Sequence, residues 1–197
     1  MNRLVIATRN RGKVAEIAGL IEKLGYSVTS LVDASQIPDT IEDADTFEGN
    51  AIKKALEASR IVGCPALADD SGLEVDALGK RPGIHSARYG GDDLSDEQRY
   101  LLLLREMQDI PEGKRTARFR CAMAYVEPQN EPLIFNGTFD GKISFSPAGV
   151  NGFGYDPVFI PDGYDITLAE IPPEEKKKIS HRAKALAAFV DWLGGDD

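Results

Sequence analysis

Residues 66–72, with the sequence ALADDSG, decide the predicted fold. The apolar residues predict a buried strand at 66–69, and Asp70-Ser71-Gly72 predicts a turn at the carboxyl end of that strand. Open α/β sheets usually hold their ligands at this end of the strands. The stretch therefore predicts an α/β protein with a binding site where the strand ends.

Strands and helices alternate on both sides of this stretch. Before it, the patterns predict a strand at 4–7, a helix that ends at Gly25, a strand at 26–31 and a helix at 46–62. After it, they predict a helix from Ser95 to Met107 with a capping box, strands at 116–126 and 133–139, and a final helix that docks through Ile179, Leu186, Phe189, Val190 and Leu193. No repeat or linker separates independent domains, so residues 1–197 are expected to form one domain.

Composition excludes several classes of protein. The chain has 197 residues, 42% of them hydrophobic, and a net charge of −9, which argues against long nucleic acid as a partner. The N-terminal sequence MNRLVIATRN has too little apolar length for a signal peptide or a membrane span, so a cytoplasmic protein is expected. Cys64 and Cys121 lie far apart without a CxxC motif, so we expect buried, reduced thiols rather than a disulfide or a zinc site.

The loop from Thr8 to Lys13 joins a predicted strand to a predicted helix. Free amides and the helix dipole favour an anion at such a position, so the loop is a candidate phosphate site. It is not a P-loop, because the first glycine of GxxxxGK[ST] is missing and Val14 follows Lys13. The alternative is structural: Thr8 or Asn10 caps the helix and Gly12 makes the turn.

Two adjacent carboxylates, Asp69 and Asp70, lie at the predicted strand end. Side chains alternate along a strand, so only one of them can face a given site. Mg²⁺ needs one or two carboxylates together with substrate phosphates, and Glu42 in the acidic stretch 39–45 is our choice for the second ligand. The alternative is an Asx-type turn beside a solvated acidic loop.

Two later segments offer groups that could bind a nucleobase. Residues 152–157, GFGYDP, place two aromatic rings beside glycines, where a purine could stack; a tight hairpin with packed rings is the alternative. Lys176 and Ser180-His181-Arg182 place cations near the expected start of a helix, where the dipole favours acids. This conflict indicates function, although a solvated helical face with Glu174 and Glu175 paired to lysines is the alternative.

The ordered set of motifs resembles the inosine triphosphate pyrophosphatase family, which acts on inosine and xanthosine triphosphates, over almost the whole chain. The motifs are Thr8, Asn10, Gly12 and Lys13; Thr46-Phe47 with Asn50-Ala51 and Lys54; Ala68-Asp69-Asp70-Ser71-Gly72-Leu73; Pro82-Gly83 with Ser86-Ala87-Arg88-Tyr89; Gly152-Phe153-Gly154-Tyr155-Asp156-Pro157; and Ser180-His181-Arg182. Each motif is weakly specific, but the ordered set is strongly specific.

The resemblance implies a mixed, elongated α/β sheet flanked by helices, an active-site cleft between two lobes, and a homodimer. It implies Mg²⁺ as cofactor, Asp70 as base and metal ligand, and Glu42 as a second metal ligand. The implied substrate-binding residues are Thr8, Arg9, Asn10, Arg11, Gly12, Lys13, Lys54, Ser71, Phe153, Gly154, Tyr155, Asp156, Lys176, His181 and Arg182. Arg9 stands where many relatives have glycine, so the phosphate contacts at this position are open.

The expected reaction is hydrolysis of dITP, ITP, XTP or dXTP to the monophosphate and pyrophosphate, which would cleanse the nucleotide pool. A pyrophosphatase of the related Maf type with another specificity is an alternative, against which residues 153–156 and 180–182 argue. A sensor that binds nucleotides without hydrolysis is a second alternative, and the presence of Asp69, Asp70 and Glu42 argues against it.

Overall fold

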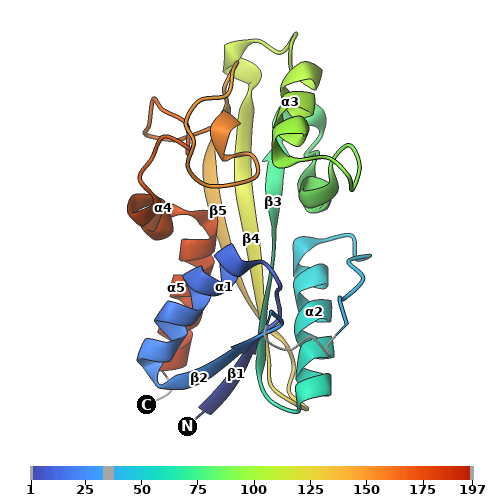
Figure 1. The fold of residues 1–197 in the computed structure, drawn as a ribbon, viewed down its shortest axis with the longest axis vertical. Coiled ribbons are helices and arrows are strands. Elements are labelled where there is room, and N and C mark those ends of the chain that lie inside the picture. The colour runs from blue at the N-terminus through green and yellow to red at the C-terminus, as the bar shows by residue number, and fades with distance from the viewer. Residues whose placement is uncertain (1, 33–37, 196–197) are drawn as a thin grey trace. The chain divides into compact units, whose positions relative to one another are not determined.

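A computed structural model describes residues 2–32 and 38–195 (Figure 1). The α-helices and strands are β1 (Asn2–Ile6), α1 (Arg11–Ile21), β2 (Tyr26–Ser30), α2 (Phe47–Val62), β3 (Ala66–Val75), α3 (Asp96–Glu106), β4 (Thr116–Val126), β5 (Leu133–Ile143), β6 (Phe159–Pro161), α4 (Pro173–Ile179) and α5 (His181–Gly194). The six-stranded sheet has the order β2-β1-β3-β4-β5-β6. Strand β1 runs parallel to β2 and β3, and β5 runs antiparallel to β6, so the predicted mixed α/β sheet is confirmed.

The chain divides into two compact units. The first unit comprises the described residues of 1–70, 121–136 and 185–197, and the second comprises 71–120 and 137–184. Strands β3, β4 and β5 each contribute residues to both units.

The two faces of the sheet in the first unit carry different residues. One face bears large apolar side chains that form a core with α1 and α5: Leu4, Ile6, Leu67, Cys121, Met123, Ile17, Ile21, Leu186 and Phe189. The alternate positions of the same strands bear small buried residues such as Ala66 and Ala68, and α2 likewise buries Ala51 and Ala55. In Figure 1, α1 and α5 lie on one side of these strands and α2 on the other. Alternation along β3 therefore directs successive side chains toward different helices.

The core of the second unit is aromatic and aliphatic. Its buried residues come from β3, β4, β5, β6, α3 and the segment after β6: Leu73, Val75, Leu103, Met107, Phe119, Phe139, Ile143, Phe159, Leu168 and Ile171. Arg115 is also buried, at 2% exposure, just before β4.

The turn predicted at Asp70-Ser71-Gly72 is wrong, because β3 continues through these residues to Val75. Turn preferences of Asp, Ser and Gly reflect exposed segments in which side chains compete for backbone hydrogen bonds. Here Asp70 is 6% exposed and bonded to side chains of α2, so the segment remains extended. The Asx-type turn that was the alternative is excluded for the same reason.

The single final helix is also wrong, because the chain breaks at Ser180 into α4 and α5. Ser180 has extended backbone angles, and its Oγ accepts a hydrogen bond from Ala183 N at 3.2 Å, which is an N-cap contact for α5. Ile179 therefore belongs to α4 and packs against the core of the second unit. Lys176 lies in the last turn of α4, where the helix dipole favours a cation, so the predicted electrostatic conflict does not exist at this residue.

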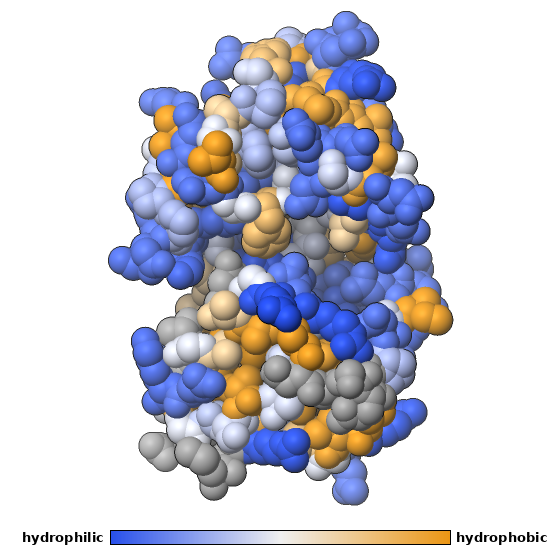
Figure 2. Space-filling view, in the orientation of Figure 1, coloured by the Kyte–Doolittle hydropathy of each residue, from blue (hydrophilic) through white to orange (hydrophobic). Residues whose placement is uncertain are grey.

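The surface of the protein is mainly hydrophilic. Hydrophilic residues dominate the face in Figure 2, and hydrophobic residues appear there in groups bordered by hydrophilic ones. Within the described residues no helix has the length and apolarity to cross a membrane. Both cysteines are free thiols; Cys121 is buried, as predicted, whereas Cys64, which was also expected to be buried, is half-buried.

Candidate functional site

The first carboxylate of the pair, Asp69, faces α1. Its side chain is fully buried, and its Oδ2 lies 2.9 Å from the Nζ of Lys13 in the first turns of that helix. Asp69 lies two residues after Leu67 in β3, so its side chain points to the same face of the sheet, and Leu67 packs there against α1 and α5. The strand geometry thus gives Asp69 a lysine partner from the predicted phosphate loop.

The second carboxylate, Asp70, faces α2. Its Oδ2 accepts a hydrogen bond from Asn50 Nδ2 at 3.2 Å, and its Oδ1 accepts one from Lys54 Nζ at 3.0 Å. The same ammonium lies 2.8 Å from Glu42 Oε1, which comes from the acidic stretch before α2. Asn50 Oδ1 also accepts from Ala44 N at 3.0 Å and so fixes that stretch against the helix. The structure therefore brings Glu42, Lys54 and Asp70 together.

Burial and charge act in opposite directions on this cluster. Burial raises the pKa of Asp70 and the nearby charge of Glu42 adds to the rise, while Lys54 and Asn50 oppose it. Burial alone would lower the pKa of Lys54, but the charges of Asp70, Asp69 and Glu42 raise it above its usual range. Lys54 is therefore an ammonium held by carboxylates.

The predicted phosphate loop is an N-cap with charged side chains around it. Asn10 caps α1 by accepting from Lys13 N at 3.1 Å, as the structural alternative predicted. Thr8 Oγ1 accepts from Asn10 N at 3.2 Å. Arg9 reaches Asp39 at 2.5 Å and Leu31 O at 2.7 Å, and Arg11 is exposed. Gly12 lies inside α1 rather than in a turn, so that part of the alternative is wrong.

The second unit holds the aromatic segment around a buried ion pair. Asp156 is 3% exposed, and its Oδ2 accepts from Phe153 N at 2.8 Å and from Lys176 Nζ. Lys176 Nζ also lies 4.6 Å from the centre of the Phe153 ring, which is 43% exposed. Burial raises the pKa of Asp156, while Lys176 and Arg182 act to lower it. This carboxylate therefore organises the segment from inside.

Two further contacts fix the segment, and sequence reasoning missed both residues that make them. The hydroxyl of Tyr155 donates to Ser86 O at 2.9 Å, and Gly154 N donates to Asp96 Oδ2 at 2.8 Å. Ser86 was one of the residues that carried the family resemblance, but no role was assigned to it. Ser86 accepts this hydrogen bond through its backbone carbonyl, which any residue type has, so the contact leaves no trace in the sequence. Asp96 looks like an ordinary acid at a helix start.

The remaining predicted residues lie at the start of α5 or directly after Asp70 in β3. His181 and Arg182 begin α5 and are buried; the His181 ring stacks on Phe119 with centroids 4.9 Å apart. Ser71 follows Asp70 in β3 and is half-buried. The predicted site residues thus fall into two groups: Thr8 to Lys13, Glu42, Lys54 and Asp70 belong to the first unit, and Ser71, Phe153 to Asp156, Lys176, His181 and Arg182 belong to the second.

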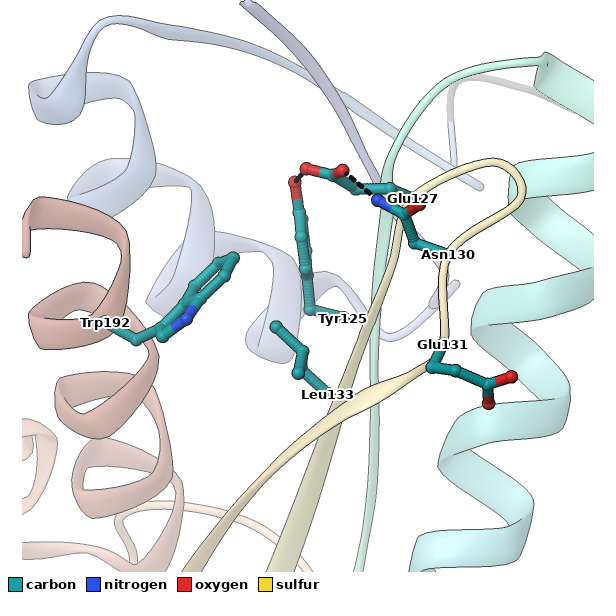
Figure 3. A pocket seen from close by; sticks show the side chains of 6 residues that line it. All are labelled: Tyr125, Glu127, Asn130, Glu131, Leu133 and Trp192. Carbon is teal, nitrogen blue, oxygen red and sulfur yellow. Dashed lines mark hydrogen bonds between the residues drawn. The ribbon is translucent and has the colours of Figure 1, made fainter. Parts of the chain in front are cut away.

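A pocket of about 170 Å³ in the first unit contains none of these residues. Tyr125, Glu127, Asn130, Glu131, Leu133 and Trp192 line it (Figure 3). Glu127 is already bonded to Tyr125 at 2.8 Å and to Asn130 at 2.7 Å, and the carboxylate of Glu131 points away from Trp192 in Figure 3. Since its polar groups satisfy one another or face outward, we do not place the functional site here.

The donors of the Asp70 cluster suit a divalent cation. No set of three or more His, Cys, Asp or Glu side chains in the described residues could enclose a metal by itself. Mg²⁺, however, is commonly held by one or two carboxylates together with substrate phosphates. Oxygens of Glu42 and Asp70 already converge on one cationic group, the Lys54 ammonium, at 2.8 and 3.0 Å. The residues therefore fit a metal that is completed by its substrate.

Known proteins match this chain in sequence and in structure over nearly its whole length. The sequence model of the Ham1 family matches residues 4–192. A dITP/XTP pyrophosphatase from Geobacter sulfurreducens is 49% identical, with 98% of each chain covered, and one from Geobacillus kaustophilus is 52% identical over 94% of this chain and 91% of its own. The solved structure of a HAM1 protein from Coxiella burnetii is similar with a TM-score of 0.93 and 40% identity over 98% of this chain and 99% of its own.

Proposed function

The chain belongs to the Ham1 family, and on that premise we propose that it is a nucleoside triphosphate pyrophosphatase that hydrolyses dITP, ITP, XTP and dXTP to monophosphate and pyrophosphate. The observation that carries this proposal is the Glu42–Lys54–Asp70 cluster, in which two carboxylates converge beside a buried ammonium. Such a cluster can bind a metal-bound polyphosphate and activate water. Removal of these aberrant nucleotides from the pool is the biological role that follows.

The phosphates would bind in the first unit. A divalent cation held by Glu42 and Asp70, which we propose to be Mg²⁺, would neutralise charge on the phosphate oxygens. Lys13 lies beside Asp69 and at the start of α1, where a helix N-terminus favours anions. Lys13 and Lys54 would stabilise the negative charge that grows on the departing pyrophosphate.

Asp70 would act on the attacking water. One of its oxygens would accept a proton as the water oxygen forms a bond to the α-phosphorus and the bond from that phosphorus to the bridging oxygen breaks. Asn50 and Lys54 hold the carboxylate in place from α2 and oppose the rise in its pKa that burial causes. Asp70 thus combines a fixed orientation with a proton affinity that burial raises.

The base would bind in the second unit. The exposed ring of Phe153 offers a stacking surface, with Lys176 close to the ring. Donors in the Ser180–Arg182 segment would donate hydrogen bonds to the 6-oxo oxygen of a purine, whereas the 6-amino group of adenine would leave them facing another donor. Selection against adenine would follow from this mismatch.

We also propose one catalytic domain, a homodimer and a cytoplasmic location. Three strands that contribute to both units support the single domain. The dimer rests on the family alone. Light scattering tests it, because a dimer has twice the 21.4 kDa mass of one chain and a mass of one chain would refute it.

Product analysis tests the proposed function. The purified protein with Mg²⁺ is given dITP, XTP, dGTP, dATP and dTTP, and monophosphate, pyrophosphate and orthophosphate are assayed separately. We expect monophosphate and pyrophosphate, with dITP and XTP strongly preferred, and an Asp70→Asn variant slower by about 10²- to 10⁴-fold, the usual effect of losing a general base. Orthophosphate release or a pyrimidine preference would contradict the proposal.

A further inference from the structure

Three elements hold the aromatic segment Phe153–Asp156 in the second unit. Lys176 of α4 binds Asp156, the carbonyl of Ser86 binds Tyr155, and Asp96 of α3 binds the backbone of Gly154. Of these three, the contact from Asp96 is the one in which a charged side chain holds the main chain between the two rings.

Both oxygens of Asp96 are engaged. Oδ2 accepts from Gly154 N at 2.8 Å, and Oδ1 accepts from Arg99 Nη1 at 3.1 Å. Arg99 in turn donates through Nη2 to Asp92 O at 3.3 Å, and its side chain is 12% exposed. The carboxylate is therefore oriented by a largely buried guanidinium before it meets the segment.

A role in helix capping does not account for this arrangement. Asp96 and Glu97 both lie in the first turn of α3, where either acid interacts favourably with the helix dipole. Ser95 and Gln98 already form a complete capping box at that end. Asp96 reaches the main chain of Gly154 in addition, 58 residues further along the chain.

Gly154 is the residue that most needs such a tether. It has a φ of 61° and open space where a side chain would stand, so its own conformation is weakly restricted. It joins the exposed ring of Phe153 to the buried ring of Tyr155. A change at Gly154 would therefore reorient Phe153 while Tyr155 stays in the core.

We propose that Asp96 is a positioning residue for the nucleobase: it fixes Gly154 and thereby the stacking surface of Phe153. This inference rests on the proposed function, in which the segment receives a purine. Apparent affinity falls in proportion to the fraction of molecules in the competent conformation. If loss of the tether reduces that fraction to about one tenth, base affinity falls about tenfold and the chemical step is left intact.

Asp96→Ala tests the proposal, with Glu97→Ala as the matched control. The control removes the same charge from the same helical turn without touching Gly154. For Asp96→Ala we expect KM for dITP to rise about tenfold and kcat to stay within about twofold. Inhibition by dIMP, which carries the base, should weaken by the same factor, and inhibition by pyrophosphate should not change. Glu97→Ala should match the wild type, and Asp96→Asn, which keeps an acceptor for Gly154 N, should lie between.

The outcomes separate the two proposals. Equal KM values for the Asp96→Ala and Glu97→Ala variants, a fall in kcat alone, or an equal weakening of pyrophosphate inhibition would overturn the role of Asp96. A wild-type protein that does not hydrolyse dITP would overturn the proposed function instead, and calorimetric binding of dIMP to the wild type and the variants would then decide the role of Asp96. Near-UV circular dichroism of each variant reports whether the fold is retained, and Asp96→Asn carries the test if the alanine variant unfolds.

Discussion

At the scale of single residues, Gly152 is the most tightly constrained glycine beside the candidate site. A Cβ at this position would lie 1.9 Å from Asp156 Oδ2, and φ is 79°. The carboxylate that would be displaced is the one that binds Phe153 N and Lys176. Asp156 can hold the segment only because residue 152 has no side chain.

Gly152→Ala should therefore destabilise the protein more than Gly154→Ala. Both substitutions place alanine at positive φ, which costs about 1–2 kcal/mol. Only Gly152→Ala adds a collision, which costs a further 1–3 kcal/mol, roughly the cost of overpacking. Urea denaturation measures the free energy of unfolding, and equal losses in the two variants would contradict this account of Asp156.

Lys54→Met tests the cation between the two carboxylates. Its removal leaves Glu42 and Asp70 close together without their shared partner, and we expect a loss of about 3 kcal/mol, the lower end for breaking a buried ion pair. Lys53→Met is the control, because the Lys53–Asp43 pair is exposed and its loss should change stability little. Millimolar Mg²⁺ should raise the melting temperature of Lys54→Met more than that of the control. Equal shifts in the two variants would argue against a metal at Glu42 and Asp70.

The sequence predicted these residues better than it predicted their contacts. Alternation along a strand predicted that Asp69 and Asp70 face different ways, and the structure pairs them with α1 and α2 respectively. The pairing of Glu42 with Lys54 depends on how the acidic stretch runs along α2, which no local pattern encodes. The ties to Gly154 and Tyr155 involve a generic helix-start acid and a backbone carbonyl, so they leave no motif.

At the scale of elements, Arg115 joins the end of α3 to the start of the segment after β5. Its guanidinium donates to Met107 O, Ile110 O, Ile143 O and Ser144 O at 2.7 to 3.1 Å, and it is 2% exposed. Orphan carbonyls at a helix end need such donors when they are buried. Burial lowers the pKa of Arg115, but four carbonyl dipoles surround the charge.

Arg115→Met should lower the free energy of unfolding by at least about 3 kcal/mol, because it removes four hydrogen bonds from a charged donor to backbone carbonyls, two of them fully buried. Arg105→Met, an exposed change in the last turn of α3, should cost about 0.5 kcal/mol or less. Thermal or urea unfolding measures both. A small effect at Arg115 would mean that water or backbone groups replace the guanidinium.

Element boundaries failed where tertiary contacts override local preference. The Asp70-Ser71-Gly72 sequence favours a turn. However, Lys13 of α1 pairs with Asp69 and Lys54 of α2 pairs with Asp70, so both carboxylates can be buried in a continuous strand. The break at Ser180 had a signal, a serine able to cap a helix, which the continuous apolar pattern from Ile179 to Leu193 obscured. By contrast, the capping box of α3 and the bounds of β4 were predicted correctly, because both are local patterns.

At the scale of the whole molecule, the shared strands predict one cooperative unit. The single tryptophan, Trp192, lies in the first unit, so its fluorescence follows that unit, while far-UV circular dichroism follows both. Since β3, β4 and β5 pass through both units, we expect coincident urea transitions by the two probes. A circular dichroism transition in two steps, only one of which the fluorescence follows, would instead indicate independent domains.

The fold class and the family followed from the sequence, because both depend on the order of motifs along the chain. The division of the site residues between two units did not, because β3 passes from one unit to the other between Asp70 and Ser71 without any break in the strand. The active-site cleft between two lobes, which the resemblance implies, stays a prediction.

The most direct test of the central claim is the position of ¹⁸O after hydrolysis of dITP in ¹⁸O-labelled water. Attack on the α-phosphorus by a water bound near Asp70 places the label in dIMP and leaves pyrophosphate unlabelled. We predict label in dIMP alone, detected by mass spectrometry. Label in pyrophosphate, or labelled orthophosphate with dIDP as the other product, would contradict the proposed reaction.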